Sequence, residues 1–264
     1  MLTAYYGLKG IPFDRSIKPE HLFVSKSSKE LLSRLKYIKE RRGIMVITGE
    51  SGVGKTTTIR SFVNHLSSLS FKHFYAPLAT VTTIDFYRQL NQKLGGEPSH
   101  FKSRLFQSIQ TLVVDLYNNS KITPVIILDE AHLMKNENYQ ELQLITNFNM
   151  DSYDPFVIIL IGQPHLADRL SRPIHKSLEQ RITIKHHLLP LEKDEVKLYI
   201  DHILKINGLS KSPFSDAAIE TIYKNTHGNL RLIGTLASNT MMLGVLQKVK
   251  TLTEEHVYKA SQEL

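Results

Sequence analysis

The stretch Gly49-Glu50-Ser51-Gly52-Val53-Gly54-Lys55-Thr56 decides the fold, because it fits the pattern G-x-x-x-x-G-K-[ST] at every fixed position. It follows an apolar run at 44–48 and leads into a segment, 57–63, that can continue as a helix. A strand, a glycine-rich loop and a helix in this order form a phosphate-binding loop, in which backbone N–H groups and the helix N-terminus surround the phosphates. The stretch therefore predicts binding of a nucleoside triphosphate.

Individual residues of the loop have separate predicted roles. We expect Lys55 to reach the β- and γ-phosphates and the Thr56 hydroxyl to bind Mg²⁺. A glycine-rich turn that matches by chance is the alternative, and the strand and helix on either side argue against it. The predicted nucleotide-binding residues of this loop are Gly49, Glu50, Ser51, Gly52, Val53, Gly54, Lys55, Thr56 and Thr57.

A second chemical element lies at Val125-Ile126-Ile127-Leu128-Asp129-Glu130-Ala131-His132. Apolar residues ahead of a carboxylate predict a buried strand with Asp129 at its carboxyl end, the edge of an open α/β sheet where ligands bind. We expect Asp129 to serve Mg²⁺, directly or through water, and Glu130 to polarise the attacking water, because that task needs a carboxylate that the metal does not occupy. The alternative is that the two acids cap a helix.

Composition narrows the class of protein. Of 264 residues, 41% are hydrophobic and 22% are charged, which is usual for a folded globular chain. There is no cysteine, which excludes disulfides and thiolate metal sites and predicts a cytoplasmic location. No apolar run is long enough to span a bilayer and no leader is recognisable, so we expect no membrane partner. The net charge of +8 favours a polyanion such as nucleic acid.

Apolar runs alternate with helical patterns along the first two thirds of the chain, which predicts a mostly parallel sheet sandwiched by helices. Residues 1–25 are expected to form an extended arm, followed by a basic helix from Ser25 to about Arg42. Predicted strands lie at 44–48, 71–76, 125–129, 156–161 and 182–184. Further predicted helices lie at about 83–94, 99–119, 192–207, 215–226, 229–247 and 253–263.

The periodicity changes at Pro190, and this change divides the chain. We predict an arm and basic helix at 1–42, an αβα nucleotide-binding core at 43–189 and a helical lid domain at 190–264. The last helix begins with an imperfect capping box, because Thr253 is followed three residues later by His256 where a glutamate is usual.

Other classes of phosphate-loop protein fit less well. A GTPase needs an Asn-Lys-x-Asp run for guanine, which is absent. Residues 129–132 spell the box of a helicase family, but those enzymes need two motor domains and the remaining chain is too short for a second. Small kinases usually lack the glutamate beside the Mg²⁺ carboxylate. A ring-forming ATPase with a helical lid fits best.

The chain resembles the AAA+ ATPases, and within them the group that contains the secretion ATPase ExeA and the transposon regulators TnsC and TniB. The motifs that carry this resemblance occur in the right order over nearly the whole chain. They are Tyr6-Gly7-Leu8, Pro12-Phe13, Gly49–Thr56, Leu128–His132, Leu160-Ile161-Gly162-Gln163-Pro164, Gln180-Arg181-Ile182 and Gly228-Asn229-Leu230-Arg231. The resemblance implies an α/β fold, with a three-layer parallel-sheet core and a C-terminal all-helical lid.

The resemblance also implies roles for three polar residues. Gln163 stands at the sensor-1 position, where its amide would hold the attacking water or the γ-phosphate; a turn that only ends a strand is the alternative. Arg181 occupies the position of the arginine that AAA+ proteins offer to the ATP of a neighbouring subunit, with Arg169 and Arg172 as rivals. Arg231 suits a sensor-2 arginine that closes the lid on ATP; the alternative, a solvent-facing arginine at a helix N-terminus, is disfavoured by the helix dipole.

Near the N-terminus, Pro12 and Phe13 would line the adenine pocket, with a hydrophobic anchor as the alternative. ATP and Mg²⁺ are the implied cofactors. The resemblance implies a homo-oligomer, a ring or a helical filament, in which each ATP site is completed by the neighbour's arginine.

The sequence as a whole therefore suggests an ATP-dependent regulator of DNA transposition. It would bind double-stranded DNA through phosphates and act on a transposase or a target-adaptor protein. Lys102 and Arg104 are the predicted DNA contacts, since the resemblance points this region toward a central pore; a solvated helix face is the alternative. The other hypothesis is an ATPase of secretion or envelope assembly with protein partners only. It ranks second because its relatives carry a membrane segment and a peptidoglycan-binding extension, neither of which is recognisable here.

Overall fold

The computed structural model describes residues 1–264 with the exception of 15–16, 78–80, 151 and 263–264. Its contacts divide it into two compact units. The unit that we call the sheet unit is made of Glu30–Glu50 and Thr58–Leu188. The unit that we call the helical unit is made of Met1–Lys29, Ser51–Thr57 and Leu189–Leu264. The predicted division at 1–42, 43–189 and 190–264 stays a prediction.

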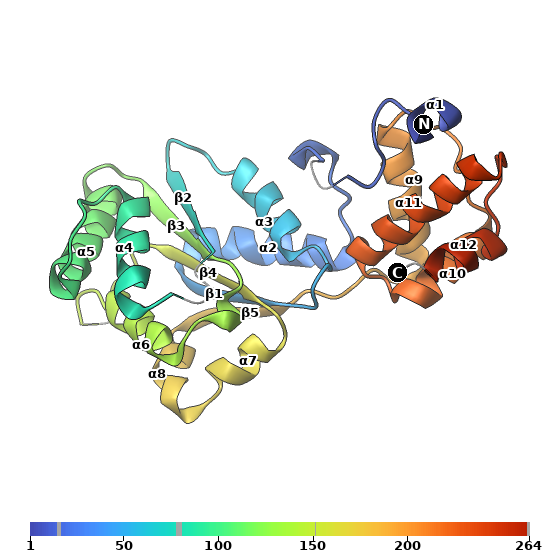
Figure 1. Ribbon diagram of the computed structural model, residues 1–264. Helices are drawn as coiled ribbons and strands as arrows, with labels where there is room; N and C mark the ends of the chain where they lie inside the picture. Colours follow the sequence, from blue (N-terminus) through green and yellow to red (C-terminus); the bar gives the residue numbers. More distant parts are fainter. Residues whose placement is uncertain (15–16, 78–80, 151, 263–264) are drawn as a thin grey trace. The chain divides into compact units, whose positions relative to one another are not determined.

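The sheet unit is built on five parallel strands in the order β2-β3-β4-β1-β5 (Figure 1). The sequence predicted all five strands; the last is longer than expected. The strands are β1 (Gly43–Thr48), β2 (Phe71–Ala76), β3 (Thr123–Leu128), β4 (Val157–Gly162) and β5 (Ile182–His187). Because they are parallel, the residues that follow β1, β3 and β4 emerge at one edge of the sheet.

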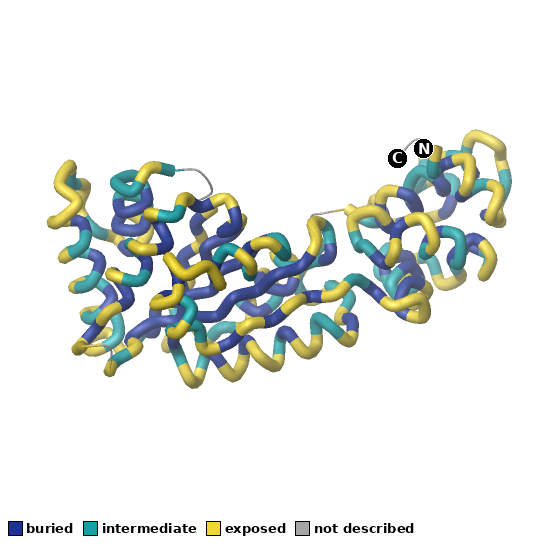
Figure 2. Tube along the Cα trace, turned by 90° about the horizontal axis from the view of Figure 1, so that it is seen from below, coloured by how far each residue is buried: buried dark blue, intermediate teal, exposed yellow. Residues whose placement is uncertain are grey.

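Burial follows position in the sheet. Every residue of β1, β3 and β4 is buried, whereas the outer strands β2 and β5 alternate between buried and more exposed residues (Figure 2). This explains why the central strands read as unbroken apolar runs, since strands covered on both faces need apolar residues throughout.

Helices cover both faces of the sheet. One face packs against apolar residues of α4 (Thr83–Leu94), α5 (Lys102–Asn118), α6 (Asn136–Ile145), α7 (His165–Leu170) and α8 (Lys176–Gln180). The opposite face of the sheet is covered by α2 (Lys26–Arg41) and α3 (Lys55–Asn64) (Figure 1). The apolar side chains that these two helices bury are Leu31, Leu35, Ile38, Ile59 and Phe62. Short 3₁₀ turns, η2 (Ala131–Leu133) and η3 (Pro173–His175), precede α6 and α8. This is the predicted three-layer α/β core.

The helical unit has its own core, formed by α9 (Lys193–Ile206), α10 (Asp216–Thr226), α11 (Leu230–Leu246) and α12 (Glu254–Ser261). These four helices confirm the all-helical lid that the sequence predicted. The imperfect capping box turns out to be complete, because His256 Nδ1 accepts the Thr253 backbone N–H at 3.1 Å. Histidine therefore does here what glutamate usually does.

The N-terminal residues differ from the expected extended arm. They begin with a short helix, α1 (Leu2–Tyr6), and include a 3₁₀ turn, η1 (Pro19–His21). Tyr6 is buried in the helical core, and its hydroxyl donates to the Met241 carbonyl at 3.3 Å. The prediction was wrong here because contacts distant in sequence, not local propensity, stabilise so short a helix. None of the described helices is long and apolar enough to cross a membrane.

Candidate functional site

The phosphate-binding loop joins β1 to α3, as the sequence predicted. Gly52 and Gly54 have φ angles of 86° and 100°, which residues that carry a Cβ adopt only under strain. Lys55 is the first residue of α3, so the loop ends at a helix N-terminus. Val53 is buried and anchors the loop, while Thr56 and Thr57 are exposed on the first turn.

Within the helical unit, the start of α11 binds this loop. Asn229 caps α11, its Oδ1 accepting the backbone N–H groups of Arg231 and Leu232, while its Nδ2 donates to the Ser51 carbonyl at 2.6 Å. The Arg231 backbone N–H donates to the Gly52 carbonyl at 3.1 Å, and its guanidinium donates to Ser51 Oγ at 3.3 Å. The predicted lid arginine therefore lies against the loop that it is expected to sense.

Glycines make this close approach possible. A Cβ at Gly52 would lie 2.4 Å from Asn229 Oδ1, and one at Gly54 would lie 2.9 Å from Leu230 Cδ1. Gly228, just before the helix, is more restricted still: a Cβ there would meet the Leu191 carbonyl oxygen at 1.9 Å. The two loop glycines thus let the side chains of Asn229 and Leu230 approach the loop backbone closely.

Phe13 also lies against α11. A Cβ at Gly234 would be 3.4 Å from Phe13 Cβ, and the Phe13 ring is 6.1 Å from that of Tyr199 on α9. Gly234 is about one helical turn beyond Arg231. The structure therefore brings Phe13 to the helix that also contacts the phosphate-binding loop; its predicted role in lining an adenine pocket remains a prediction.

In the sheet unit, Asp129 follows β3 at the carboxyl edge of the sheet. It is 5% exposed, and both carboxylate oxygens accept hydrogen bonds: Oδ1 from the Glu130 backbone N–H and Oδ2 from the Tyr75 hydroxyl, each at 2.9 Å. Burial, followed by the bond to Asp129, raises the pKa of Tyr75 well above its usual value, so this hydroxyl stays a donor. These two hydrogen bonds fix the orientation of the Asp129 carboxyl group at the edge of the sheet.

Glu130 is placed very differently from Asp129. It adopts φ 53° and ψ 31°, a left-handed conformation uncommon outside glycine. Its side chain is 54% exposed, and Oε2 lies 3.4 Å from Nδ1 of the buried His132. The backbone thus turns this second carboxylate outward while the first one points inward, which matches the separate roles predicted for them.

Gln163 directly follows β4, so the structure brings the sensor-1 candidate to the edge that carries Asp129 and Glu130. Its backbone N–H donates to His132 Nδ1 at 3.3 Å. The register pairs Thr48 with Gly162, so the first loop residues Gly49 and Glu50 emerge beside Gln163. The sheet unit therefore brings five of the predicted site residues to one edge: Gly49, Glu50, Asp129, Glu130 and Gln163.

The three arginine candidates are held in different ways. Arg169 is engaged internally: it donates to the backbone carbonyls of His132 and Met134 and lies over the Tyr139 ring. Arg181, the residue just before β5, donates to the Gln143 carbonyl at 3.2 Å. Arg172 is exposed before η3. The contacts of Arg169 fix the turn after Glu130, and Arg181 also contacts its own unit; which of the three acts on a neighbouring ATP stays a prediction.

The two predicted DNA contacts open α5. Lys102 Nζ forms an ion pair with Glu141 Oε1 at 2.5 Å and lies over the Tyr87 ring, so much of its charge is neutralised. Arg104 is exposed and lies 5.2 Å from the centre of the exposed Phe101 ring. Of the pair, Arg104 is the better placed to meet a phosphate.

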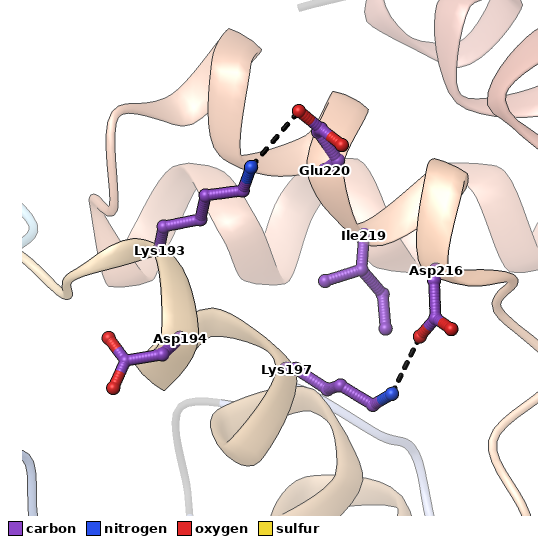
Figure 3. A pocket seen from close by; sticks show the side chains of 6 residues that line it. All are labelled: Lys193, Asp194, Lys197, Asp216, Ile219 and Glu220. Atoms are coloured by element: carbon purple, nitrogen blue, oxygen red, sulfur yellow. Dashed lines mark hydrogen bonds and ion pairs between the residues drawn. The ribbon is translucent and has the colours of Figure 1, made fainter.

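A hollow of about 550 Å³ lies in the helical unit, between α9 and α10. Its lysines point toward acids of the facing helix (Figure 3): Lys193 donates to Glu220 at 3.0 Å and Lys197 to Asp216 at 2.6 Å. Asp194 also lines the hollow, so two lysines face three acids and the formal charge is −1, which does not attract a nucleotide.

Comparison with known proteins identifies the class. The model of the AAA domain family matches residues 38–170, the strand–loop–helix and the strand before Asp129 included, so the chain belongs to the AAA+ ATPase family and is an ATP hydrolase. It is 29% identical over 255 residues to the general secretion pathway protein A of Aeromonas hydrophila. That match covers 92% of this chain but only 44% of the relative.

Solved structures show the same fold at low sequence identity. Cdc6p of Pyrobaculum aerophilum superposes with a TM-score of 0.70 at 15% identity, covering 95% of this chain and 70% of that one. The Drosophila origin recognition complex bound to DNA gives a TM-score of 0.68 at 17% identity, covering 98% and 64%. Thermotoga maritima RuvB gives 0.61 at 18% identity, covering 97% and 72%.

The sequence did not single out three residues of the candidate site. Tyr75 reads as part of an apolar strand, although its position at the end of β2 is a signal for a polar contact at the sheet edge. Asn229 belongs to one of the motifs, but the sequence analysis gives it no role of its own, although asparagine before an apolar helix is a typical N-cap. His132 completes the four-residue box, and only the fold brings it beside Gln163.

Proposed function

We propose that this protein is an ATP-driven switch that assembles on double-stranded DNA, with α11 sensing the nucleotide. ATP bound in the Ser51–Thr57 loop is sensed by Asn229 and Arg231, and hydrolysis at Glu130 resets the switch. ATP supplies the phosphoanhydride bond whose cleavage makes the cycle irreversible. The switch is an ATPase by family; the nucleotide control of assembly and the DNA partner are the proposal.

One observation carries this proposal: residues 51–57 of the phosphate-binding loop belong to the same compact unit as the lid helices. Asn229 and Arg231 hydrogen-bond to Ser51 and Gly52, the first half of the loop. Phosphates bound by the loop amides would act on these contacts directly, because the guanidinium now on Ser51 Oγ can transfer to a phosphate oxygen. The lid would therefore respond to the presence of the γ-phosphate.

The residues fit ATP with Mg²⁺. Positive φ angles at Gly52 and Gly54 form the kind of backbone concavity that binds anions. Thr56 would supply a hydroxyl ligand, and Asp129 would hold the ion through water, since its buried oxygens already accept two hydrogen bonds. Glu130, exposed and outside these bonds, would orient the attacking water.

Three observations support DNA as the partner. The chain carries a formal net charge of +8, and the exposed Arg104 extends its side chain on the surface over Phe101. A solved relative of the same fold, the Drosophila origin recognition complex, is bound to DNA. Binding through phosphates would be independent of sequence and strongly dependent on salt. Regulation of DNA transposition is the particular form that the sequence resemblance suggests, and it rests on that resemblance alone.

The test is retention of a random-sequence duplex in a gel at low salt, with a slowly hydrolysed ATP analogue or with ADP. We expect retention with the analogue, loss with ADP and a steep fall as salt rises. Arg104→Ala should weaken retention more than Lys102→Ala, with Lys211→Ala as an exposed control. Absence of retention at low salt with the analogue would contradict the DNA partner but leave the ATPase untouched.

An ATPase of secretion or envelope assembly is the second candidate, and the likeness to the general secretion pathway protein A favours it. In that case protein partners replace DNA, and the lid would transmit the nucleotide state to them. The genes beside this one separate the candidates: a transposase of the integrase type supports the first, an outer-membrane secretin the second.

A further inference from the structure

In the sheet unit, one imidazole nitrogen lies next to two residues of the candidate hydrolysis site. His132 Nδ1 accepts the backbone N–H of Gln163 at 3.3 Å and lies 3.4 Å from Glu130 Oε2. The His132 side chain is only 3% exposed, whereas that of Glu130 is 54% exposed. A buried ring therefore joins the candidate base to the residue that follows β4.

The two neighbours need opposite states of Nδ1. A backbone N–H can only donate, so Gln163 needs the lone pair of an unprotonated Nδ1; a carboxylate can only accept, so Glu130 needs a proton there. The tautomer that serves Gln163 carries its proton on Nε2 and turns a lone pair toward the Glu130 carboxylate. Each state of His132 thus binds one neighbour and releases the other.

The ring has little freedom to avoid this conflict. It lies edge-on to the His165 ring, with centres 4.6 Å apart, and Arg169 donates to the His132 carbonyl. Gly162 lets the end of β4 approach closely, since a Cβ there would be 3.2 Å from the His132 backbone nitrogen. A displacement of Gln163 would therefore change the hydrogen bonding of Nδ1 before it moved the ring.

We propose that His132 is a positioning residue that makes the orientation of Glu130 depend on Gln163. While Nδ1 accepts from Gln163, the lone pair keeps the Glu130 carboxylate off the ring and available to a water molecule. When that bond is lost, Nδ1 takes a proton from solvent and holds Glu130 in an ion pair, which stops it from acting as a base. This inference rests on the proposed roles of Glu130 and Gln163.

Three substitutions at His132 separate this role from simple packing. Asparagine places an amide oxygen where Nδ1 stands, so His132→Asn keeps an acceptor for Gln163; glutamine places its amide near Nε2, and alanine removes both. We expect His132→Ala and His132→Gln to lower kcat for ATP about tenfold or more, with KM within about twofold. His132→Asn should restore kcat to within about threefold of the unchanged protein.

Steady-state ATP hydrolysis and thermal unfolding are measured for each variant, with His73→Asn on β2 as an exposed control. A kcat unchanged in His132→Ala would overturn the inference. So would equal loss of kcat in all three variants together with a lowered Tm, since a packing role predicts no rescue by asparagine. Glu130→Gln is measured in parallel: if that variant still turns over ATP, the assignment of the base fails, whatever His132 does.

A double-mutant cycle tests the coupling itself. Gln163→Pro removes the backbone N–H that donates to His132 Nδ1, whereas Gln163→Ala keeps it and serves as the control. Gln163→Pro should lower kcat more than Gln163→Ala does, and this difference should shrink in the His132→Ala background, because Glu130 no longer responds to that bond. Equal fold-changes in both backgrounds would show that the two residues act independently, and the inference would be wrong.

Discussion

The helical unit and the sheet unit hold their candidate site residues by different means. In the helical unit, the loop at Ser51–Thr57 is bound by a few polar contacts from Asn229 and Arg231. In the sheet unit, Asp129 and Gln163 extend directly from strands buried on every residue. Single hydrogen bonds contribute about 0.5–1.5 kcal/mol each, so the loop contacts can exchange for a ligand at small cost. The strand ends are anchored by the buried core, so they have less freedom to move than the loop contacts.

The difference suggests a division of labour. Recognition of the nucleotide and the response of the lid belong to the unit whose contacts exchange easily. The acid–base chemistry belongs to the unit that keeps its carboxylates in place. Substitutions in one unit should therefore change affinity, and those in the other should change turnover.

The largest effect is expected from a substitution in the sheet unit. Glu130→Gln should lower kcat for ATP by about 10²–10⁴, because an amide cannot accept a proton from water. ATP affinity, measured with a fluorescent analogue, should change by less than about threefold. Glu137→Gln, an exposed acid on α6, serves as the control. Turnover that survives in Glu130→Gln would remove this residue from the chemistry.

The next largest effect is expected from a change at a backbone position of the helical unit. Gly228→Ala should reduce the free energy of unfolding by about 2–4 kcal/mol, since it adds left-handed strain and a clash with the Leu191 carbonyl. Gly7→Ala has a similar φ of 72° but nothing within 4 Å, so it should cost only about 1 kcal/mol. Denaturant unfolding measures both. Equal losses would mean that the close approach of Leu191 is unimportant.

A smaller effect concerns affinity. Arg231→Ala should weaken ATP binding about tenfold, because hydrogen bonds to a charged group contribute about 1.5–3 kcal/mol. ADP binding should change less, since the γ-phosphate is the expected contact. The control is Lys211→Ala, an exposed cation of the same unit. Equal weakening for ATP and ADP would show that Arg231 does not distinguish the two nucleotides.

The smallest effect is a pH dependence in the sheet unit. Burial, with Arg169 and Arg172 nearby, lowers the pKa of His175, and its Nδ1 is buried without a hydrogen-bond partner. The unfolded chain therefore takes up the proton first as pH falls. The contribution of neutral His175 to the free energy of unfolding is thus complete above about pH 6.5 and declines below it. Unfolding of His175→Gln should show a shallower decline, and His73→Gln should match the unchanged protein. A steeper decline in His175→Gln would reverse the sign of this argument.

The fold could be read from the sequence where local pattern and environment agree. The central strands are apolar throughout because both faces are covered, and α4 stops at Gly95, whose φ of 94° suits glycine. The helix α1 could not be predicted, because it depends on the contact of Tyr6 with Met241, more than two hundred residues away.

The candidate site divides in the same way. The phosphate-binding loop and the pair Asp129-Glu130 are contiguous motifs, so their chemistry could be predicted from the sequence. The bond from Tyr75 to Asp129 and that from Gln163 to His132 join separate strands. No local pattern encodes such contacts, since they depend on the strand order of the folded sheet.

The central claim is that the lid helix α11 senses the γ-phosphate through its contacts with the loop. Hydrogen exchange of the segment at 229–234 tests it most directly, with the ATP analogue, with ADP and without nucleotide. The account predicts that exchange in this segment differs between the ATP analogue and ADP, and that Arg231→Ala abolishes the difference. Exchange that changes only at 49–57, with α11 the same in all three states, would contradict it.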